Sequence, residues 1–377
     1  MLGAGASGSA VVRALAARGV AGPLLLVDDG SVPIAERVWA SWLAIEDAAD
    51  DAVISASWRR LVVATDRGER VLGLTRHRYV AVRGPDLRDA TDAALRTVRG
   101  ERLTATATAV HEDGDSVVVA TSSGDVRADL VLDSVGLLDA GVREPRAWMS
   151  FAGCEIETDG PVFDRDAVRL MDFRVPQVGG ATFAYTLPWA RDRALVELTT
   201  ISAEPTSTRP DIAAHLDRVL GAGRHRVVRR ESGVLPLAPR LRRPRSARGL
   251  AIGAAAGLVR ASTGYGYARM RRDAARIAEQ LRRGEPPSGL RRSARHHAMD
   301  AVFLELATHD PATLVDSLDL LFARTPADLV LRFLDEATSP REEARLVSSL
   351  PTRPFVAAAV RAGRPFARGR ALRRQGR

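Results

Sequence analysis

The chain has 377 residues, of which 46% are hydrophobic and 27% are charged, and its formal net charge is +9. The length allows two or more domains, and the composition is ordinary for a folded globular protein. No run of about 18 apolar residues occurs, so we expect no membrane-spanning helix. Cys154 is the single cysteine, which excludes an internal disulfide and a cysteine metal cluster. We therefore predict a cytoplasmic location and no metal site.

The positive charge comes entirely from arginine, because the sequence contains no lysine. Much of it lies in residues 224–248 and in a tail, residues 361–377, that has no acidic residue. Such patches attract nucleic acid or anionic lipid. No nucleic-acid-binding motif accompanies them, so we expect no nucleic acid partner. The tail is either solvated, disordered chain or a contact with an anionic membrane surface, which would make the protein peripheral to the membrane.

The first residues of the chain contain Gly3, Gly5 and Gly8 in the spacing G-x-G-x-x-G. In a Rossmann βαβ unit the first glycine makes a tight turn, and the second lets the backbone approach a pyrophosphate. The third lets the helix pack closely on the strand. Helical spacing over residues 9–18 follows, and the pattern therefore predicts a dinucleotide site.

An apolar strand is predicted over residues 24–27, and it ends at Asp28, which is placed to bind a ribose hydroxyl. The strand that should precede the glycine loop is nearly absent, because only Met1 and Leu2 stand before Gly3. Either the true start lies upstream, which we favour, or this strand is degenerate.

Further along, Trp39 and Trp42 lie close together, and this spacing suits the wall of a pocket or packing in the core. The remaining pattern predicts the following elements. Strands are expected over residues 61–64, 70–74, 78–83, 104–111, 116–121, 125–132, 170–175, 181–187, 194–201 and 249–253. Helices are expected over residues 85–98, 208–220, 267–283, 291–309, 311–324, 326–338 and 340–349.

One carboxylate is unusual in this pattern. Glu197 stands inside a strand that otherwise consists of apolar and β-branched residues. It is either an acid with a function in a buried site or a strand carboxylate paired with one of the many arginines.

With these segments in order, the chain resembles the bacterial lycopene β-cyclases, nearly from end to end. The motifs that carry the resemblance, besides the glycine loop and Glu197, are these: Arg37-Val38-Trp39, Met171-Asp172-Phe173-Arg174, Phe183-Ala184-Tyr185-Thr186-Leu187-Pro188, Gly233-Val234-Leu235-Pro236, Ser262-Thr263-Gly264-Tyr265, Asp300-Ala301-Val302-Phe303-Leu304 and Arg332-Phe333-Leu334-Asp335. Their order and spacing together are specific, although no single motif decides.

The resemblance implies an α/β, Rossmann-type FAD-binding flavoprotein fold that is discontinuous in sequence, with a β-rich substrate domain and a helical C-terminal region. It implies FAD in the reduced form as cofactor and NAD(P)H as the reductant. It also implies lycopene or a related linear carotenoid, taken from the membrane, as the substrate. The reaction is then an isomerisation that closes a ring by protonation, attack of a neighbouring double bond and loss of a proton.

The resemblance also assigns roles to residues. Glu197 is expected to be the proton donor, because burial raises the pKa of a carboxyl group and keeps it protonated. Asp172 and Arg174 are expected to shape the pocket and hold each other. The expected cofactor-binding residues are Gly3, Gly5, Gly8, Asp28, Arg37, Asp133, Gly253, Gly257, Thr263, Gly264 and Tyr265. The expected substrate-pocket residues are Trp39, Asp172, Arg174, Tyr185 and Glu231.

The same assignment divides the chain into segments. The FAD-binding domain takes residues 1–60, 101–150 and 229–288, and a substrate-domain insertion takes residues 61–100. The β-rich substrate domain takes residues 151–228, the helical region 289–360 and the basic tail 361–377. Two alternatives remain open: a related FAD-dependent monooxygenase or prenyl reductase, and a degenerate homologue without flavin.

Overall fold

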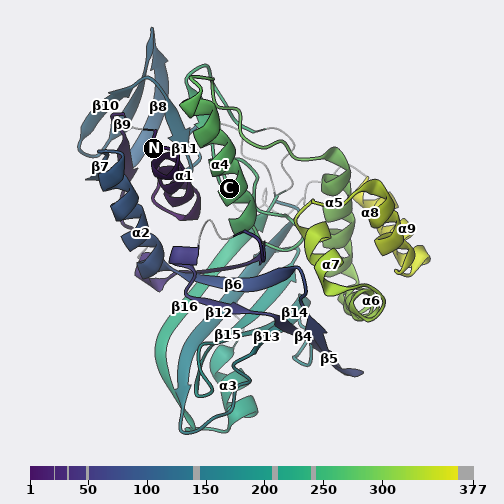
Figure 1. Cartoon of the computed structure of the whole chain (residues 1–377). Coiled ribbons are helices and arrows are strands. Elements are labelled where there is room, and N and C mark those ends of the chain that lie inside the picture. Colours follow the sequence, from purple (N-terminus) through teal and green to yellow (C-terminus); the bar gives the residue numbers. More distant parts are fainter. Residues whose placement is uncertain are drawn as a thin grey trace, which may run out of the picture.

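The structure is a computed structural model of the whole chain, and it describes residues 1–20, 22–31, 34–47, 51–138, 145–205, 211–238 and 243–363. A small parallel sheet lies under the helices near the N-terminus (Figure 1). It pairs β1 (Leu25–Asp28) with β7 (Glu101–Thr104) and β11 (Val131–Asp133) with β17 (Gly249–Ala251). Leu2 joins the two pairs through parallel bridges to Val27 and Asp133. The strand expected before the glycine loop is thus reduced to this residue, which is buried at the centre of the sheet.

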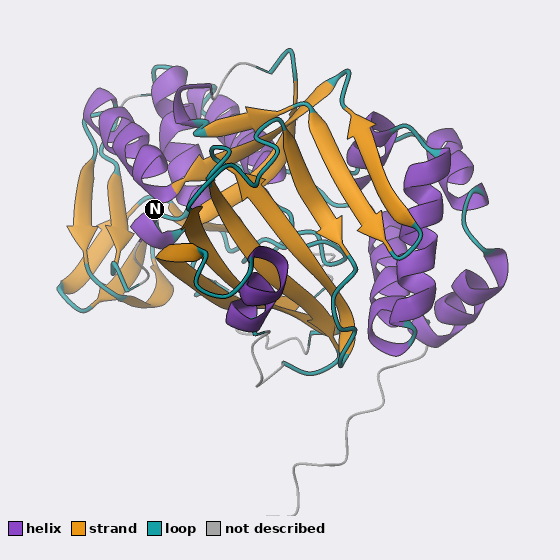
Figure 2. Ribbon diagram, turned by 90° about the horizontal axis from the view of Figure 1, so that it is seen from below, coloured by secondary structure: helices purple, strands orange, loops and turns teal. Residues whose placement is uncertain are grey.

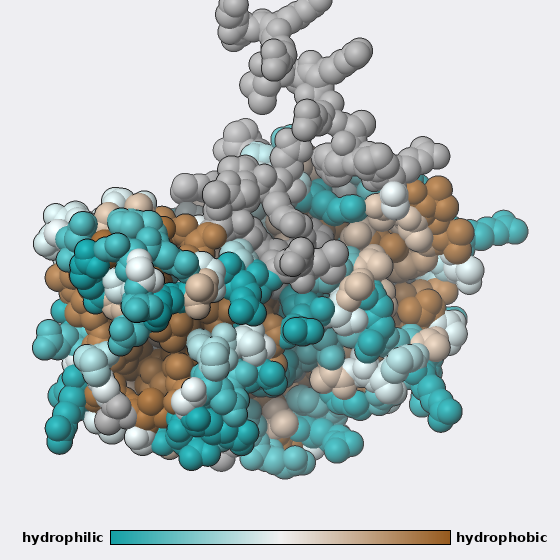
Figure 3. All heavy atoms as spheres, turned by 90° about the horizontal axis from the view of Figure 1, so that it is seen from above, coloured by the Kyte–Doolittle hydropathy of each residue, from teal (hydrophilic) through white to brown (hydrophobic). Residues whose placement is uncertain are grey.

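This sheet is the middle of three layers. On one face, α1 (Ala6–Ala17), α2 (Gly84–Thr97) and α4 (Tyr267–Arg282) share an apolar core with it. On the other face, β8 (Ala107–Asp113), β9 (Ser116–Thr121) and β10 (Gly124–Ala128) form an antiparallel sheet that packs on Leu2 and Val27. From above, apolar atoms line a hollow on the side of β8–β10, with hydrophilic side chains around it (Figure 3).

A seven-stranded sheet lies below this region. Its order is β16 (His225–Leu237), β12 (Ala147–Thr158), β15 (Arg193–Ser202), β14 (Gly180–Pro188), β13 (Ala167–Asp172), β4 (Arg60–Thr65) and β5 (Gly68–Gly73). All its pairs are antiparallel except β13 with β4. Helix α3 (Ile212–Leu220) lies across one face, as the view from below shows (Figure 2).

The other face of this sheet is covered by two elements. One is a three-stranded sheet of β2 (Val38–Ala44), β6 (His77–Arg83) and β3 (Ala56–Trp58). The other is part of the C-terminal helices, and all of them share one apolar core with the sheet. The helices are α5 (Ala294–His309), α6 (Pro311–Arg324), α7 (Ala327–Leu334), α8 (Pro340–Ser348) and α9 (Thr352–Ala362). Two short 3₁₀ turns, Ile34–Glu36 and Asp51–Val53, complete the described elements.

The sequences at the starts of α6 and α8 explain why these helices begin where they do. Asp310 accepts a hydrogen bond from the Thr313 amide at the start of α6, and Ser339 forms a capping box with Glu342 at the start of α8. A proline stands in the first turn of both helices, where its missing N–H costs nothing. In the described part of the chain, no helix combines the length and the apolar character needed to cross a membrane.

Most predicted elements are confirmed, including the hairpin of β4 and β5, strand β6 and helices α2, α4 and α6. Other predictions need correction. The arm predicted over 125–132 is two strands, β10 and β11, the helix predicted over 326–338 ends at Leu334, and the helix predicted over 208–220 begins at Ile212. Strands β2, β3, β12 and β16 and helix α9 were not predicted as individual elements, although β12 lies largely in the stretch expected to be β-rich and α9 largely in the expected helical region. Residues 206–210 and 364–377, which include most of the basic tail, lie outside the described residues, so the contact of the tail with a membrane stays a prediction.

Two proposed domain boundaries, 150/151 and 228/229, fall inside β12 and β16. Both strands belong to the seven-stranded sheet, and β2 and β3 pair with β6 and not with the parallel sheet. The segments 1–60, 101–150 and 229–288 therefore each contribute strands outside the nucleotide-binding region.

Candidate functional site

A large pocket opens at the glycine-rich loop, next to the first turn of α1 and the last residue of β1. Gly3 has a φ of +87°, which favours glycine. Gly8 lies so close to the preceding turn that a Cβ there would stand 2.0 Å from the Gly3 carbonyl oxygen. A Cβ on Gly5, by contrast, would meet no atom within 4 Å and would project beside the pocket that Gly5 lines. This is the cradle that a pyrophosphate needs at a helix N-terminus.

Asp28 lines this pocket beside the glycine-rich loop. Its carboxylate accepts hydrogen bonds from the Ala4 amide (2.6 Å) and the Gly30 amide (3.0 Å), and it lines the pocket. Arg37 and Trp39 line the same pocket. The residues present therefore fit a flavin dinucleotide: Gly5 would face its pyrophosphate and Asp28 its ribose. Trp39, expected among the substrate residues, lies here because it points from β2 toward the nucleotide pocket.

The other expected cofactor residues are placed differently. Asp133 is fully buried, and its carboxylate accepts the amides of Val135, Gly136 and Leu138, so it holds its own turn. Gly253 has a φ of +63°, and a Cβ on it would stand 2.7 Å from the Ser7 side chain, so it packs against the start of α1. Of the segment that begins at Gly253, Ala254 and Met270 line the nucleotide pocket. Gly257 lies in the turn that follows Ala254 and has a φ of +73°.

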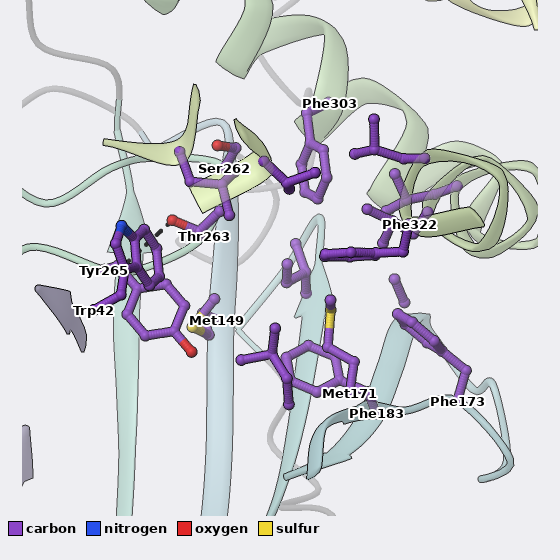
Figure 4. Close-up of a pocket in the computed structure, with 18 residues that line it drawn as sticks. Trp42, Met149, Met171, Phe173, Phe183, Ser262, Thr263, Tyr265, Phe303 and Phe322 are labelled. Carbon is purple, nitrogen blue, oxygen red and sulfur yellow. Dashed lines mark hydrogen bonds between the residues drawn. The ribbon is translucent and has the colours of Figure 1, made fainter. Parts of the chain in front are cut away.

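A second cavity lies between the seven-stranded sheet and the C-terminal helices. Its walls are almost wholly apolar (Figure 4). The sheet contributes Met149, Leu170, Met171, Ala181, Phe183 and Ile201, and the helices contribute Phe303, Leu318, Leu321, Phe322 and Val330. Trp42 and Tyr265 lie together at one end of it. Thr263 and Tyr265, expected at the cofactor, therefore line the apolar cavity, and Gly264 packs beside it against Met149.

Two carboxyl groups meet on the same face of the sheet. Gly153 of β12 pairs with Glu197 of β15 on one side and with Glu231 of β16 on the other. Because Gly153 has no side chain, the two carboxyl groups can approach across it, and Glu231 comes within hydrogen-bonding reach of Glu197. The hydroxyl of Thr199 also donates to Glu197, at 2.7 Å.

The surroundings of the two acids differ. Burial, followed by the charge of Glu231, raises the pKa of Glu197 to about 8. Burial also raises the pKa of Glu231, but Arg229 opposes this by donating to its carboxylate at 2.8 Å. Two like acids in contact share a proton, and the cation beside Glu231 favours its ionised form. The proton is therefore held on Glu197 at neutral pH.

Glu231 belongs to a wider cluster of charged side chains from β6, β12, β15 and β16. Its centre is Glu155, which is 2% exposed and paired with Arg83, Arg193 and Arg229. Burial alone would raise the pKa of Glu155, but its cations lower it. The sequence did not identify Glu155 as a site residue, because its arginine partners lie on strands that are far away along the chain.

Tyr185 lies directly opposite Glu197 in the pairing of β14 with β15. Its hydroxyl is 2.8 Å from that of Tyr79, which is itself 2.6 Å from that of Tyr265. Tyr79 was not predicted as a site residue.

Asp172 and Arg174 do not join this site. A bulge in β13 between Arg169 and Asp172 turns Leu170 and Met171 toward the apolar cavity and Asp172 toward α3. The two residues therefore line a separate pocket under α3, on the opposite face of the sheet, which corrects their placement with the substrate residues. They do hold each other, as expected, through hydrogen bonds of 2.9 and 2.7 Å.

Comparison with solved structures shows that this architecture has the Rossmann-type fold of FAD-binding flavoproteins. The structure superposes on a geranylgeranyl bacteriochlorophyll reductase-like protein from Thermoplasma acidophilum with a TM-score of 0.64, 16% identity and coverage of 93% of this chain and 98% of the other. A variant of the halogenase PltM in complex with FAD gives a TM-score of 0.61 at 12% identity over 96% of this chain and 93% of the other. Within this fold class, the chain belongs to the lycopene cyclase protein family, whose model matches residues 1–360. The fold class and the family resemblance are thus confirmed.

Curated relatives match only part of the chain. A chloroplastic lycopene beta cyclase of Arabidopsis thaliana is 31% identical over 48% of this chain and 40% of its own length. A chloroplastic neoxanthin synthase of Solanum lycopersicum is 28% identical over 46% of this chain and 38% of its own length. The match to these two relatives thus spans about two fifths of their length.

Proposed function

We propose that this protein is a flavin-dependent carotenoid cyclase that closes an end of lycopene, or of a related linear carotenoid, into a β-ionone ring. The observation that carries the proposal is the position of Glu197. It is a carboxyl group with a raised pKa on the same sheet face as an apolar cavity, in a chain of the lycopene cyclase family.

The chemistry follows from this arrangement. Glu197 donates its proton to the terminal double bond, and a tertiary cation forms. The neighbouring double bond attacks this cation and closes the ring. A proton then leaves a carbon beside the new cationic centre and returns to the carboxylate pair, so that no atoms or electrons are gained or lost overall. The apolar walls exclude water, which would otherwise trap the cation.

Glu231 helps Glu197 to act as the proton donor. Held ionised by Arg229, it keeps the pKa of Glu197 high and places negative charge near the cation. Gly5 and Asp28 would hold the dinucleotide of FAD. When bound and reduced by NAD(P)H, FAD would supply further negative charge, which favours formation of the cation.

Expression in a bacterium that accumulates lycopene tests the proposal. We expect the red pigment to become orange or yellow as rings form. Unchanged lycopene in cells that contain folded, flavin-loaded protein would contradict it.

A further inference from the structure

Three of the four tyrosines of the chain meet at one point, although they come from three different parts of the fold. Tyr79 lies on β6 of the three-stranded sheet, Tyr185 on β14 of the seven-stranded sheet and Tyr265 in the loop before α4. Tyr79 is completely buried, with Trp42 and Trp58 as its cross-strand neighbours. This tyrosine cluster therefore joins both sheets to the loop.

The hydroxyl groups form a chain with Tyr79 at its centre. A phenol carries one proton, so Tyr79 can donate to only one neighbour and must accept from at least one of them, over 2.8 and 2.6 Å. Burial raises the pKa of all three phenols, so the chain is uncharged at any pH at which the protein would work.

One end of the chain of hydroxyl groups lies next to the acid, and the other end lies at the apolar cavity. Tyr185 is the cross-strand neighbour of Glu197. Tyr265 lines the cavity, and its ring meets the edge of Trp42 with centroids 4.7 Å apart. The loop that presents Tyr265 is fixed, because the Arg260 amide donates to the Tyr265 carbonyl at 2.8 Å and the Arg260 guanidinium is paired with buried Asp300. Tyr265 is thus held from the loop side by Arg260 and from the sheet side by Tyr79.

We propose that Tyr79 is a positioning residue that holds Tyr265 and Tyr185 as an uncharged aromatic wall beside the ring cation, and that this wall determines which hydrogen the cation loses. This inference rests on the proposed function.

The chemistry gives the wall a specific task. Hydrogens stand on three carbons around the tertiary cation, and loss from each gives a ring with its double bond in a different place. A neutral phenol stabilises a nearby cation through its ring face and its oxygen, and it is too weak a base to take the proton itself. The proton therefore leaves on the side of the carboxylate pair, and the rigid wall fixes which carbon faces that side.

The experiment compares Tyr79→Phe with Tyr267→Phe in full-length, FAD-loaded protein supplied with lycopene. Both changes remove one oxygen from a buried tyrosine ring, but Tyr267 lies outside the cluster. Because Tyr79→Phe removes two buried hydrogen bonds, we expect kcat to fall about tenfold or more with KM changed less than about twofold. We also expect one ring type to become a mixture. Tyr267→Phe should keep the wild-type ring type and stay within about twofold in kcat.

The outcomes separate the two proposals. A wild-type protein that cyclises lycopene, together with a Tyr79→Phe variant that keeps its ring type and kcat, would overturn the role of Tyr79, even if its melting temperature fell. A flavin-loaded wild type that leaves lycopene unchanged would overturn the proposed function, and this inference with it. If Tyr79→Phe does not fold, Tyr265→Phe is the second test, because it removes the hydrogen bond between Tyr79 and Tyr265 but keeps the bond between Tyr79 and Tyr185. An unchanged ring type and an unchanged kcat in this variant would then overturn the role of Tyr79.

Discussion

Glu197 and Glu231 face each other across Gly153, each paired in register with the residue that has no side chain. A Cβ at this position would lie 3.3 Å from the Glu197 Cβ and 3.3 Å from the Val196 carbonyl oxygen. The glycine therefore gives the two acids the space to share a proton. Arg229 lies beside Glu231 and favours its ionised form, so the proton stays on Glu197.

Replacing Glu197 by glutamine removes the acid but preserves the shape and the hydrogen bond from Thr199. We expect Glu197→Gln to lower cyclisation at least about 100-fold, the usual size of a general-acid contribution, while FAD stays bound. Chromatography of the pigments and the flavin absorbance of the purified protein measure the two effects. Glu157→Gln, at the partly exposed end of β12, is the matched control and should retain activity. Normal turnover by Glu197→Gln would remove this residue from the acid role.

The raised pKa of Glu197 sets the pH dependence. The donor must be protonated, so the rate should be level below about pH 7 and fall about tenfold per pH unit above a pKa of about 8. Rates measured in flavin-loaded protein between about pH 6 and about pH 9.5 check this. A rate that rises through this range would show that the ionised form of the pair is the active one.

The nucleotide pocket can be tested at Gly5, where a methyl group meets no protein atom. We expect Gly5→Ala to change the stability of the flavin-free protein by less than about 1 kcal/mol but to raise the Kd for FAD at least about tenfold, because the methyl would occupy the place of the pyrophosphate. Thermal unfolding and flavin titration measure the two quantities. Gly22→Ala, at another unobstructed but exposed glycine, should change neither. Equal FAD affinity in both variants would place the dinucleotide elsewhere.

Asp172 should matter for stability more than for chemistry, since it faces α3. Burial opposes its ionisation, but hydrogen bonds from Arg174 lower the pKa of Asp172 below its ordinary value of 3.8. The stabilisation is therefore present above this value and is lost as the pH falls through the lower, folded-state value.

We accordingly expect Asp172→Asn to unfold at lower denaturant concentration than the wild type at neutral pH, with the gap closing in acid. Its cyclisation rate should stay within a few-fold of the wild type. Asp166→Asn, on the exposed loop before β13, is the control. A variant of full stability that has lost its activity would restore Asp172 to the reaction.

The local parts of this account could be predicted from the sequence. The glycine loop and the helical spacing after it depend on residues only a few positions apart, and Glu197 stood out as an acid in an apolar strand. The resemblance to a family supplied the site residues that no periodicity could give.

The remainder depends on contacts between distant residues. Tyr79 meets partners 106 and 186 positions away, and nothing in its own strand identifies them. Strand β16 contains Arg226, Arg229, Arg230 and Pro236, so its sequence does not show the apolar alternation of a strand, although an edge position accommodates the arginines and the proline. The bulge in β13 shifts the alternation by one residue, and for this reason the Asp172 side chain lies on the face opposite to the one expected.

The mass of the product formed from lycopene by the reduced, FAD-loaded protein tests the central claim most directly. Protonation, ring closure and proton loss leave the composition unchanged, so we predict a ring-bearing isomer of the same mass as lycopene. A product heavier by two hydrogens would indicate a reductase, and one heavier by an oxygen a monooxygenase. Either product, or lycopene returned unchanged, would contradict the account.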